Sequence, residues 1–144
     1  MQTENDISFP KIIIDASIAV KWFAFEQGTP EARALLKKAS EGTVLLYAPD
    51  LLLYEVANAL GKGKRLAKQA IDLSLETLWD KVKLEALEQR LAKTAINFML
   101  DYDLSYYDAV YVALAYGLEI PLLSSDLKAH KNIKGITTLT LNDF

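Results

Sequence analysis

The sequence predicts a three-layer α/β/α sandwich with a mainly parallel central sheet. Short aliphatic runs alternate along the chain with longer stretches whose apolar residues recur at helical spacing. The first run, Lys11-Ile-Ile-Ile-Asp15, ends in an acid, which is typical of a buried parallel strand that carries a polar group at its end. Strands that alternate with helices form parallel sheets covered on both faces, and ligands bind at the carboxyl ends of their strands.

Local signals place the individual elements. Serine or threonine caps are expected to begin three helices, at Ser17, Thr29 and Ser105. Glycines are expected to end helices at Gly42, Gly61, Gly63 and Gly117. The expected helices cover residues 18–23, 29–41, 51–60, 66–78, 85–101 and 106–116. The expected strands cover 11–15, 43–48, 120–123 and 136–141, and the stretch around 81–84 also fits a short strand.

Composition bounds the class of protein. The chain has 144 residues, 51% of them hydrophobic, so we expect one domain over 1–144 with a polar lead-in over 1–10. It has no cysteine and one histidine, His130, which excludes disulfides, thiol nucleophiles and zinc sites built from several histidines. The absence of cysteine suits a reducing cytosol, and neither a basic leader nor a long apolar span predicts secretion or membrane insertion. We therefore expect a cytoplasmic protein that does not enter a membrane.

Four acids stand where a purely structural chain would not choose them. Asp15 and Asp126 each follow a predicted strand, at the sheet edge where ligands bind. Glu55 lies in an apolar helix and shares one face with Asn58. Asp108 directly precedes an apolar run. Because two strand ends and two helices can converge at the sheet edge, the four acids together indicate one site.

Each acid taken alone also has a structural interpretation. Asp15 and Asp126 fit helix N-caps. Glu55 fits the rim of an apolar helical stripe, and Ser105-x-x-Asp108 before an apolar run is the signature of a capping box. At the level of the sequence, these alternatives stay open.

A cluster of acids indicates a particular chemistry. Carboxylates crowded together repel one another and resist ionisation, so a cluster is best explained by a hard divalent cation. Mg²⁺ prefers one or two carboxylates, waters and phosphate oxygens. The chemistry that this implies is metal-assisted hydrolysis of a phosphodiester.

Four segments carry a resemblance to a known family. They are Lys11-Ile-Ile-Ile-Asp-Ala-Ser17, Tyr54-Glu-Val-Ala-Asn-Ala-Leu60, Leu104-Ser-Tyr-Tyr-Asp-Ala-Val-Tyr-Val-Ala-Leu-Ala115 and Leu122-Leu-Ser-Ser-Asp126. In this order, and spanning nearly the whole chain, they resemble the four motifs of PIN-domain ribonucleases, specifically the VapC-type toxins of toxin–antitoxin pairs. The resemblance implies an α/β/α sandwich, dependence on Mg²⁺ or Mn²⁺, and endonucleolytic cleavage of RNA. It also implies a homodimer and a cognate antitoxin whose C-terminal segment would occupy the acidic cleft.

The resemblance also assigns residues. The catalytic and metal-binding quartet of the family matches Asp15, Glu55, Asp108 and Asp126. Its accessory polar positions match Ser17, Asn58 and Ser124, and Ser124 keeps a hydroxyl where the family often has threonine. The family's mechanism would have a metal-activated water attack the phosphorus while a cation stabilises the leaving oxygen.

RNA binding needs concentrated positive charge, because the net charge is −3. No acid lies between Glu55 and Asp72, or between Asp126 and Asp143. We expect the basic residues of these two segments to hold phosphates on either side of the scissile bond. They are Lys62, Lys64, Arg65, Lys68, Lys128 and Lys131, together with His130 and Lys134. Solvated helix faces are the structural alternative.

Two other functions stay open. A PIN nuclease of RNA processing or quality control would act without an antitoxin. A non-catalytic PIN-like module would bind RNA or protein through the same cleft. The four acids argue against the second option, because a pure RNA binder gains nothing from carboxylates that face phosphates.

Overall fold

A parallel sheet forms the centre of the computed structural model, which describes residues 9–126 and 132–144. Its strands are β1 (Lys11–Ile14), β2 (Leu45–Pro49), β3 (Val82–Glu85), β4 (Leu122–Leu123) and β5 (Thr138–Leu139). They lie in the order β3-β2-β1-β4-β5, and every pairing is parallel. The strand expected over 81–84 is therefore present, as the edge strand β3.

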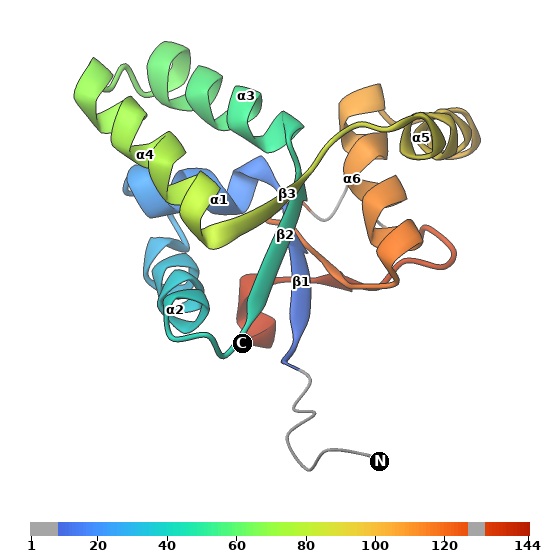
Figure 1. The fold of residues 1–144 in the computed structure, drawn as a ribbon, viewed down its shortest axis with the longest axis horizontal. Helices are drawn as coiled ribbons and strands as arrows, with labels where there is room; N and C mark the ends of the chain where they lie inside the picture. Colours follow the sequence, from blue (N-terminus) through green and yellow to red (C-terminus); the bar gives the residue numbers. More distant parts are fainter. Residues whose placement is uncertain (1–8, 127–131) are drawn as a thin grey trace.

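Helices cover both faces of the sheet. The helices are α1 (Ala16–Phe23), α2 (Thr29–Ser40), α3 (Leu51–Asn58), α4 (Lys68–Lys81), α5 (Gln89–Tyr102) and α6 (Tyr106–Leu118), with a π-helical turn η1 (Ala59–Gly63) and a 3-10 turn η2 (Leu141–Asp143). Figure 1 shows α1 to α4 on one face and α5 and α6 on the other. The predicted three-layer α/β/α fold class is confirmed.

The core follows from the apolar runs of the sequence. The three isoleucines of β1 are at most 2% exposed, as expected for a central strand with helices on both faces. In α6 every residue from Ala109 to Ala115 is buried, because this helix packs on the sheet and is itself covered by α5. A helix that is apolar all round must be buried in this way.

Several predicted helix boundaries are wrong by a residue or more. α1 begins at Ala16, so Ser17 lies inside its first turn instead of capping it, and Gly28 rather than Thr29 precedes α2. Gly61 does not end a helix, because α3 continues into η1 as far as Gly63. The cap at Ser105 is confirmed, since its hydroxyl accepts a hydrogen bond from the Asp108 N–H at 3.1 Å.

Gly117 also fails to end its helix. The residue that leaves α6 in the left-handed conformation is Glu119, with φ 57°, and Arg65 does the same after η1, also with φ 57°. Glycine is favoured at such positions because it has no Cβ, but other residues adopt them at a cost in energy. The sequence signal therefore marks the right region and the wrong residue.

The strand order indicates where a ligand would bind at the edge of the sheet. From β1 the chain continues to β2 on one side, whereas β4 lies on the other side, so the order reverses at the β1–β4 boundary. Ligands of open α/β sheets bind at such a switch point, beyond the carboxyl ends of the strands. Because Ile14 pairs with Leu123, the next residues, Asp15 and Ser124, leave the sheet side by side.

None of the helices in the described part of the chain has the length and apolar character needed to cross a bilayer.

Candidate active site

Asp15 lies at the switch point and is 9% exposed. Its two carboxylate oxygens each accept a hydroxyl hydrogen bond, Oδ1 from Ser17 and Oδ2 from Ser124, both at 2.5 Å. Asp15 occupies the N-cap position of α1, but its side chain makes no capping hydrogen bond. Asp15 therefore takes the N-cap position that the structural interpretation expects, but its carboxylate is oriented by the two serines and does not cap the helix.

The same serines fasten the loop after β4. Ser17 Oγ accepts the N–H of Ser125 at 2.9 Å, and Ser124 Oγ accepts the N–H of Asp126 at 3.0 Å. A hydroxyl can donate one proton and still accept other hydrogen bonds, so both serines serve Asp15 and the loop together. This explains why the chain needs a hydroxyl at both positions.

Glu55 faces the same end of the sheet from α3. Tyr111, on α6, donates a hydrogen bond from its hydroxyl to Glu55 Oε1 at 2.6 Å. Burial raises the pKa of Glu55 above its ordinary value, the Tyr111 hydrogen bond opposes this, and the negative charges of Asp15 and Asp108 raise the pKa further. Burial, then the charge of Glu55, also raises the pKa of Tyr111, so its phenol keeps its proton.

Asp108 enters from the first turn of α6, where negative charge is favourable. The hydroxyl of Ser105 accepts a hydrogen bond from the backbone N–H of Asp108. Within the described residues, the Asp108 carboxylate does not accept the Ser105 backbone N–H, so the capping box is not completed. The structural interpretation thus explains Ser105 but leaves the Asp108 carboxylate available to the site.

The structure brings three of the four predicted acids together. Asp15 and Asp108 are the carboxylates whose charges act on Glu55. Asp126 is exposed and is connected to the site through its backbone N–H. Asn58 is exposed one turn beyond Glu55 on α3.

The oxygen donors suit a hard divalent cation, although direct ligands are not preassembled. In residues 9–126 and 132–144, no three aspartate, glutamate, cysteine or histidine side chains form a group that could hold a metal ion. Mg²⁺ keeps several waters and takes only one or two carboxylates directly. The three acids therefore fit a partly hydrated cation, whose charge would relieve their mutual repulsion.

The first predicted basic segment is partly neutralised by acids. Lys64 forms an ion pair with Glu26 at 3.0 Å, and Lys68 pairs with Asp72 at 2.7 Å. Lys62 and Arg65 are exposed, and no ion pair involves them among the described residues. In the second segment, Lys128, His130 and Lys131 lie outside the described residues, and Lys134 is exposed.

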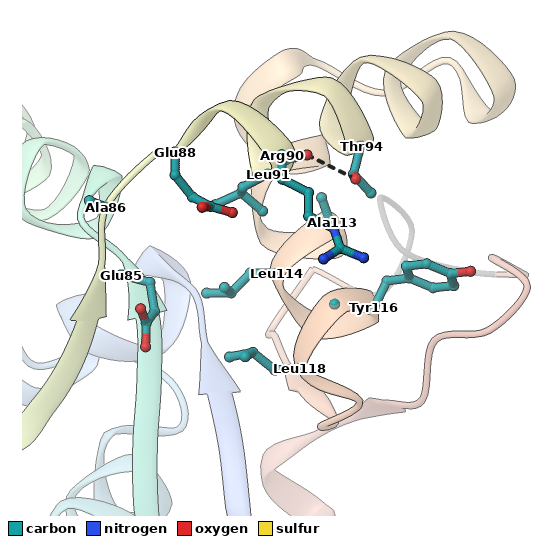
Figure 2. A pocket seen from close by; sticks show the side chains of 11 residues that line it. Glu85, Ala86, Glu88, Arg90, Leu91, Thr94, Ala113, Leu114, Tyr116 and Leu118 are labelled. Carbon is teal, nitrogen blue, oxygen red and sulfur yellow. Dashed lines mark hydrogen bonds between the residues drawn. The ribbon is translucent and has the colours of Figure 1, made fainter.

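A cavity of about 480 Å³ lies away from the acids, between the end of β3, α5 and α6. Figure 2 shows Glu85 and Glu88 on one side of it, Arg90 reaching in from α5, and Leu114 and Leu118 on α6. None of the four predicted acids lines this cavity. The candidate site is therefore the switch-point cluster and not the cavity.

Two residues that affect the site and the first basic segment, Tyr111 and Glu26, were not predicted from the sequence. Tyr111 lies three residues after Asp108 and so shares its helix face, which is a signal that could have marked it. Glu26 is remote in sequence from Lys64 and gives no local signal. Both contacts arise only when α3 and its extension pack beside other elements.

The chain is similar to known proteins in both sequence and fold. The PIN domain family model matches residues 12–135. Ribonuclease VapC3 of Pyrobaculum aerophilum is 30% identical over 133 residues, which cover 89% of this chain and 98% of that protein.

Solved structures share the fold. VapBC2 from Rickettsia felis bound to a DNA fragment from its promoter aligns with a TM-score of 0.70 at 12% identity, over 90% of this chain and 98% of that one. Mycobacterium tuberculosis VapC20, a sarcin-ricin loop cleaving toxin, gives 0.67 at 16% identity, over 85% and 97%. A toxin–antitoxin complex from Klebsiella pneumoniae gives 0.63 at 20% identity, over 90% and 97%. The chain therefore belongs to the PIN domain family and, within it, to the VapC-type proteins.

Proposed function

We propose that this protein is a divalent-metal-dependent endoribonuclease that hydrolyses RNA phosphodiester bonds. The observation that carries the proposal is the convergence of Asp15, Glu55 and Asp108 at the switch point. There the negative charges of Asp15 and Asp108 repel the ionised Glu55. A protein that only bound RNA would be weakened by carboxylates facing phosphates. A hydrolase that binds Mg²⁺ or Mn²⁺ requires them.

The side chains divide into ligands and supports. Asp15, Glu55 and Asp108 would hold the cation, with Asp126 joining from the loop after β4. A cation bound there would lower the pKa of a water and neutralise charge developing on the phosphate. Ser17 and Ser124 keep both oxygens of Asp15 in place for this task.

RNA would be held mainly by residues beside the acids. Lys62 lies in η1 and Arg65 lies just after it, both downstream of Glu55, and neither is neutralised by an acid in the described structure. Lys64 would contribute only after separation from Glu26. Lys128 and Lys131 stay predictions for the second flank, as does the homodimer.

We infer that the protein acts as a toxin restrained by an antitoxin. The Klebsiella pneumoniae complex supports a protein partner, since it is a toxin–antitoxin assembly with this fold. The VapC3 relative is a ribonuclease and matches nearly the full length of the chain, which supports the activity. An active nuclease would damage the RNA of its own cell, so a restraining partner is expected.

Incubation with total cellular RNA, followed by mapping of new RNA ends, tests the activity. The wild-type protein with Mn²⁺ is expected to give discrete cuts that disappear with EDTA and with Asp15→Asn. The matched control is Asp80→Asn, because Asp80 is an exposed aspartate at the end of α4, just before β3 begins. Cuts that persist in Asp15→Asn, or in EDTA, would contradict the proposal.

A further inference from the structure

We propose that Tyr111 is a positioning residue of the cation site, whose hydroxyl fixes the Glu55 carboxylate so that the other carboxylate oxygen faces the cation. The inference rests on the proposed function, since it requires these acids to bind a divalent cation. Tyr111 acts through Glu55 and has no role of its own in the chemistry.

The ring of Tyr111 is a rigid support. Its side chain is 2% exposed and belongs to the hydrophobic core, between the buried Val110 and Val112. Close packing in a protein core holds a ring of this size in one rotamer. The position of its hydroxyl is therefore set by the core and not by the site.

The hydroxyl has no packing role that explains it. Along the buried part of α6, from Ala109 to Ala115, it is the one polar side-chain atom. A phenylalanine would fill nearly the same volume. A buried tyrosine hydroxyl requires a hydrogen-bond partner, and here the partner is Glu55 Oε1 at 2.6 Å.

Glu55 needs such a support because its side chain is long and flexible. It is only half-buried on α3, so its carboxylate keeps one orientation only where a fixed partner holds it. In the part of the chain that the structure describes, Tyr111 is the one hydrogen-bond donor to this carboxylate. Since α3 and α6 lie on opposite faces of the sheet (Figure 1), the bond joins the two helices that carry Glu55 and Asp108.

Removal of the hydroxyl tests the inference through metal affinity. The free Mn²⁺ concentration is read from its electron paramagnetic resonance signal during titration of the purified full chain. Groups that orient metal ligands typically contribute 10–100-fold to affinity, so Tyr111→Phe is expected to weaken Mn²⁺ binding by about 10-fold or more. The matched control is Tyr106→Phe, which removes a hydroxyl from the same helix that donates to the Ala92 carbonyl at 3.0 Å. The control is expected to bind Mn²⁺ as the wild type does.

A double-mutant cycle separates positioning from a general loss of structure. In a Glu55→Ala background, Tyr111→Phe is expected to change Mn²⁺ affinity by less than about twofold, because the hydroxyl has no ligand left to orient. If Glu55→Ala binds too weakly to titrate, the same cycle is read from melting temperatures in EDTA. There the destabilisation caused by Tyr111→Phe should vanish once Glu55 is absent.

Each result decides a different point. Unchanged Mn²⁺ affinity in Tyr111→Phe, or an equal loss with and without Glu55, would overturn the positioning role while leaving the proposed function intact. Failure of the wild-type protein to bind Mn²⁺ would overturn the metal proposal, and the positioning role with it.

Discussion

At the scale of single residues, the site places like charges together at a cost in stability. Glu55 is half-buried beside two other carboxylates, and burial raises its pKa above the ordinary value. The folded protein then holds this proton more tightly than the unfolded chain does, so stability falls as pH rises through the two pKa values. At neutral pH, the ionised Glu55 destabilises the metal-free fold, which is a common compromise between stability and function.

Glu55→Gln should therefore raise the melting temperature in EDTA at pH 7. Glutamine keeps an oxygen that accepts the Tyr111 hydrogen bond, but it removes the repelled charge. The same variant should lose most of the stabilisation that Mn²⁺ gives the wild type, since a bound ligand stabilises the fold by RT ln(1 + [L]/Kd), which falls to zero when Kd greatly exceeds the ligand concentration. Glu76→Gln, at an exposed glutamate of α4, is the control and should change neither value. A lower melting temperature for Glu55→Gln in EDTA would contradict the repulsion.

At the scale of elements, the π-helical turn after α3 shapes the first basic segment. η1 ends at Gly63, and Arg65 then adopts a left-handed backbone with φ 57°. π-helical turns and strained backbones occur often at functional sites. We therefore predict that the exposed Arg65 side chain contributes to RNA binding, which would offset the cost of its backbone conformation.

The variant Arg65→Gly separates the effect of the Arg65 backbone conformation on stability from the effect of its side chain on RNA binding. Glycine removes the cost of the left-handed conformation, so the free energy of unfolding should stay the same or rise by up to about 1 kcal/mol in urea denaturation. When Arg65→Gly is made in the Asp15→Asn background, which is expected not to cut RNA, RNA affinity and its salt dependence should both fall. The control is Asp103→Gly, because Asp103 is also left-handed with φ 53°. It should change the free energy of unfolding as Arg65→Gly does, without a loss of RNA affinity. If RNA binding by Arg65→Gly were unchanged, Arg65 would not contact RNA.

Ion pairs of Glu26 also act at this scale, because they join the segment after α1 to the segment after η1. Glu26 bonds Lys21 and Lys64, both at 3.0 Å. Partial burial works to raise the pKa of Glu26, but the hydrogen bonds and charges of the two lysines outweigh it and lower the pKa below its ordinary value. A lowered pKa means that Glu26 stabilises the fold above its unfolded-state pKa and stops doing so as pH falls through the folded value.

Glu26→Gln should therefore be less stable than the wild type at pH 7, by about 1 kcal/mol or less because these groups are partly exposed. The difference should shrink as the pH is lowered from about 5 to 3, where the wild-type glutamate takes up a proton. Urea denaturation at a series of pH values measures it, with Glu31→Gln on the exposed side of α2 as the control. A difference that is constant over this range would show that the ion pairs do not cause it.

At the scale of the whole molecule, the sequence predicts the layers and the sheet edge, because these depend on local apolar patterns. Lys11-Ile-Ile-Ile-Asp15 is sufficient to identify β1 and to place Asp15 at its carboxyl end. The helix cap predicted at Ser17 is wrong, because its hydroxyl bonds the Asp15 carboxylate inside the first turn of α1, which agrees with the accessory polar position that the family resemblance assigns to Ser17. The Tyr111–Glu55 bond and the Lys64–Glu26 pair connect segments far apart in the chain, so local patterns do not pair these residues, although the spacing of Tyr111 from Asp108 places both on one helix face.

The most direct test of the central claim is to locate the cation itself. Crystals of the protein grown with Mn²⁺ and measured at a wavelength where manganese scatters anomalously should show a peak among the carboxylates of Asp15, Glu55 and Asp108. In Asp15→Asn crystals treated in the same way, the peak should weaken or vanish. A peak only elsewhere, for example beside Glu85 and Glu88, or none at saturating Mn²⁺, would contradict the assignment of the switch-point acids as the metal site.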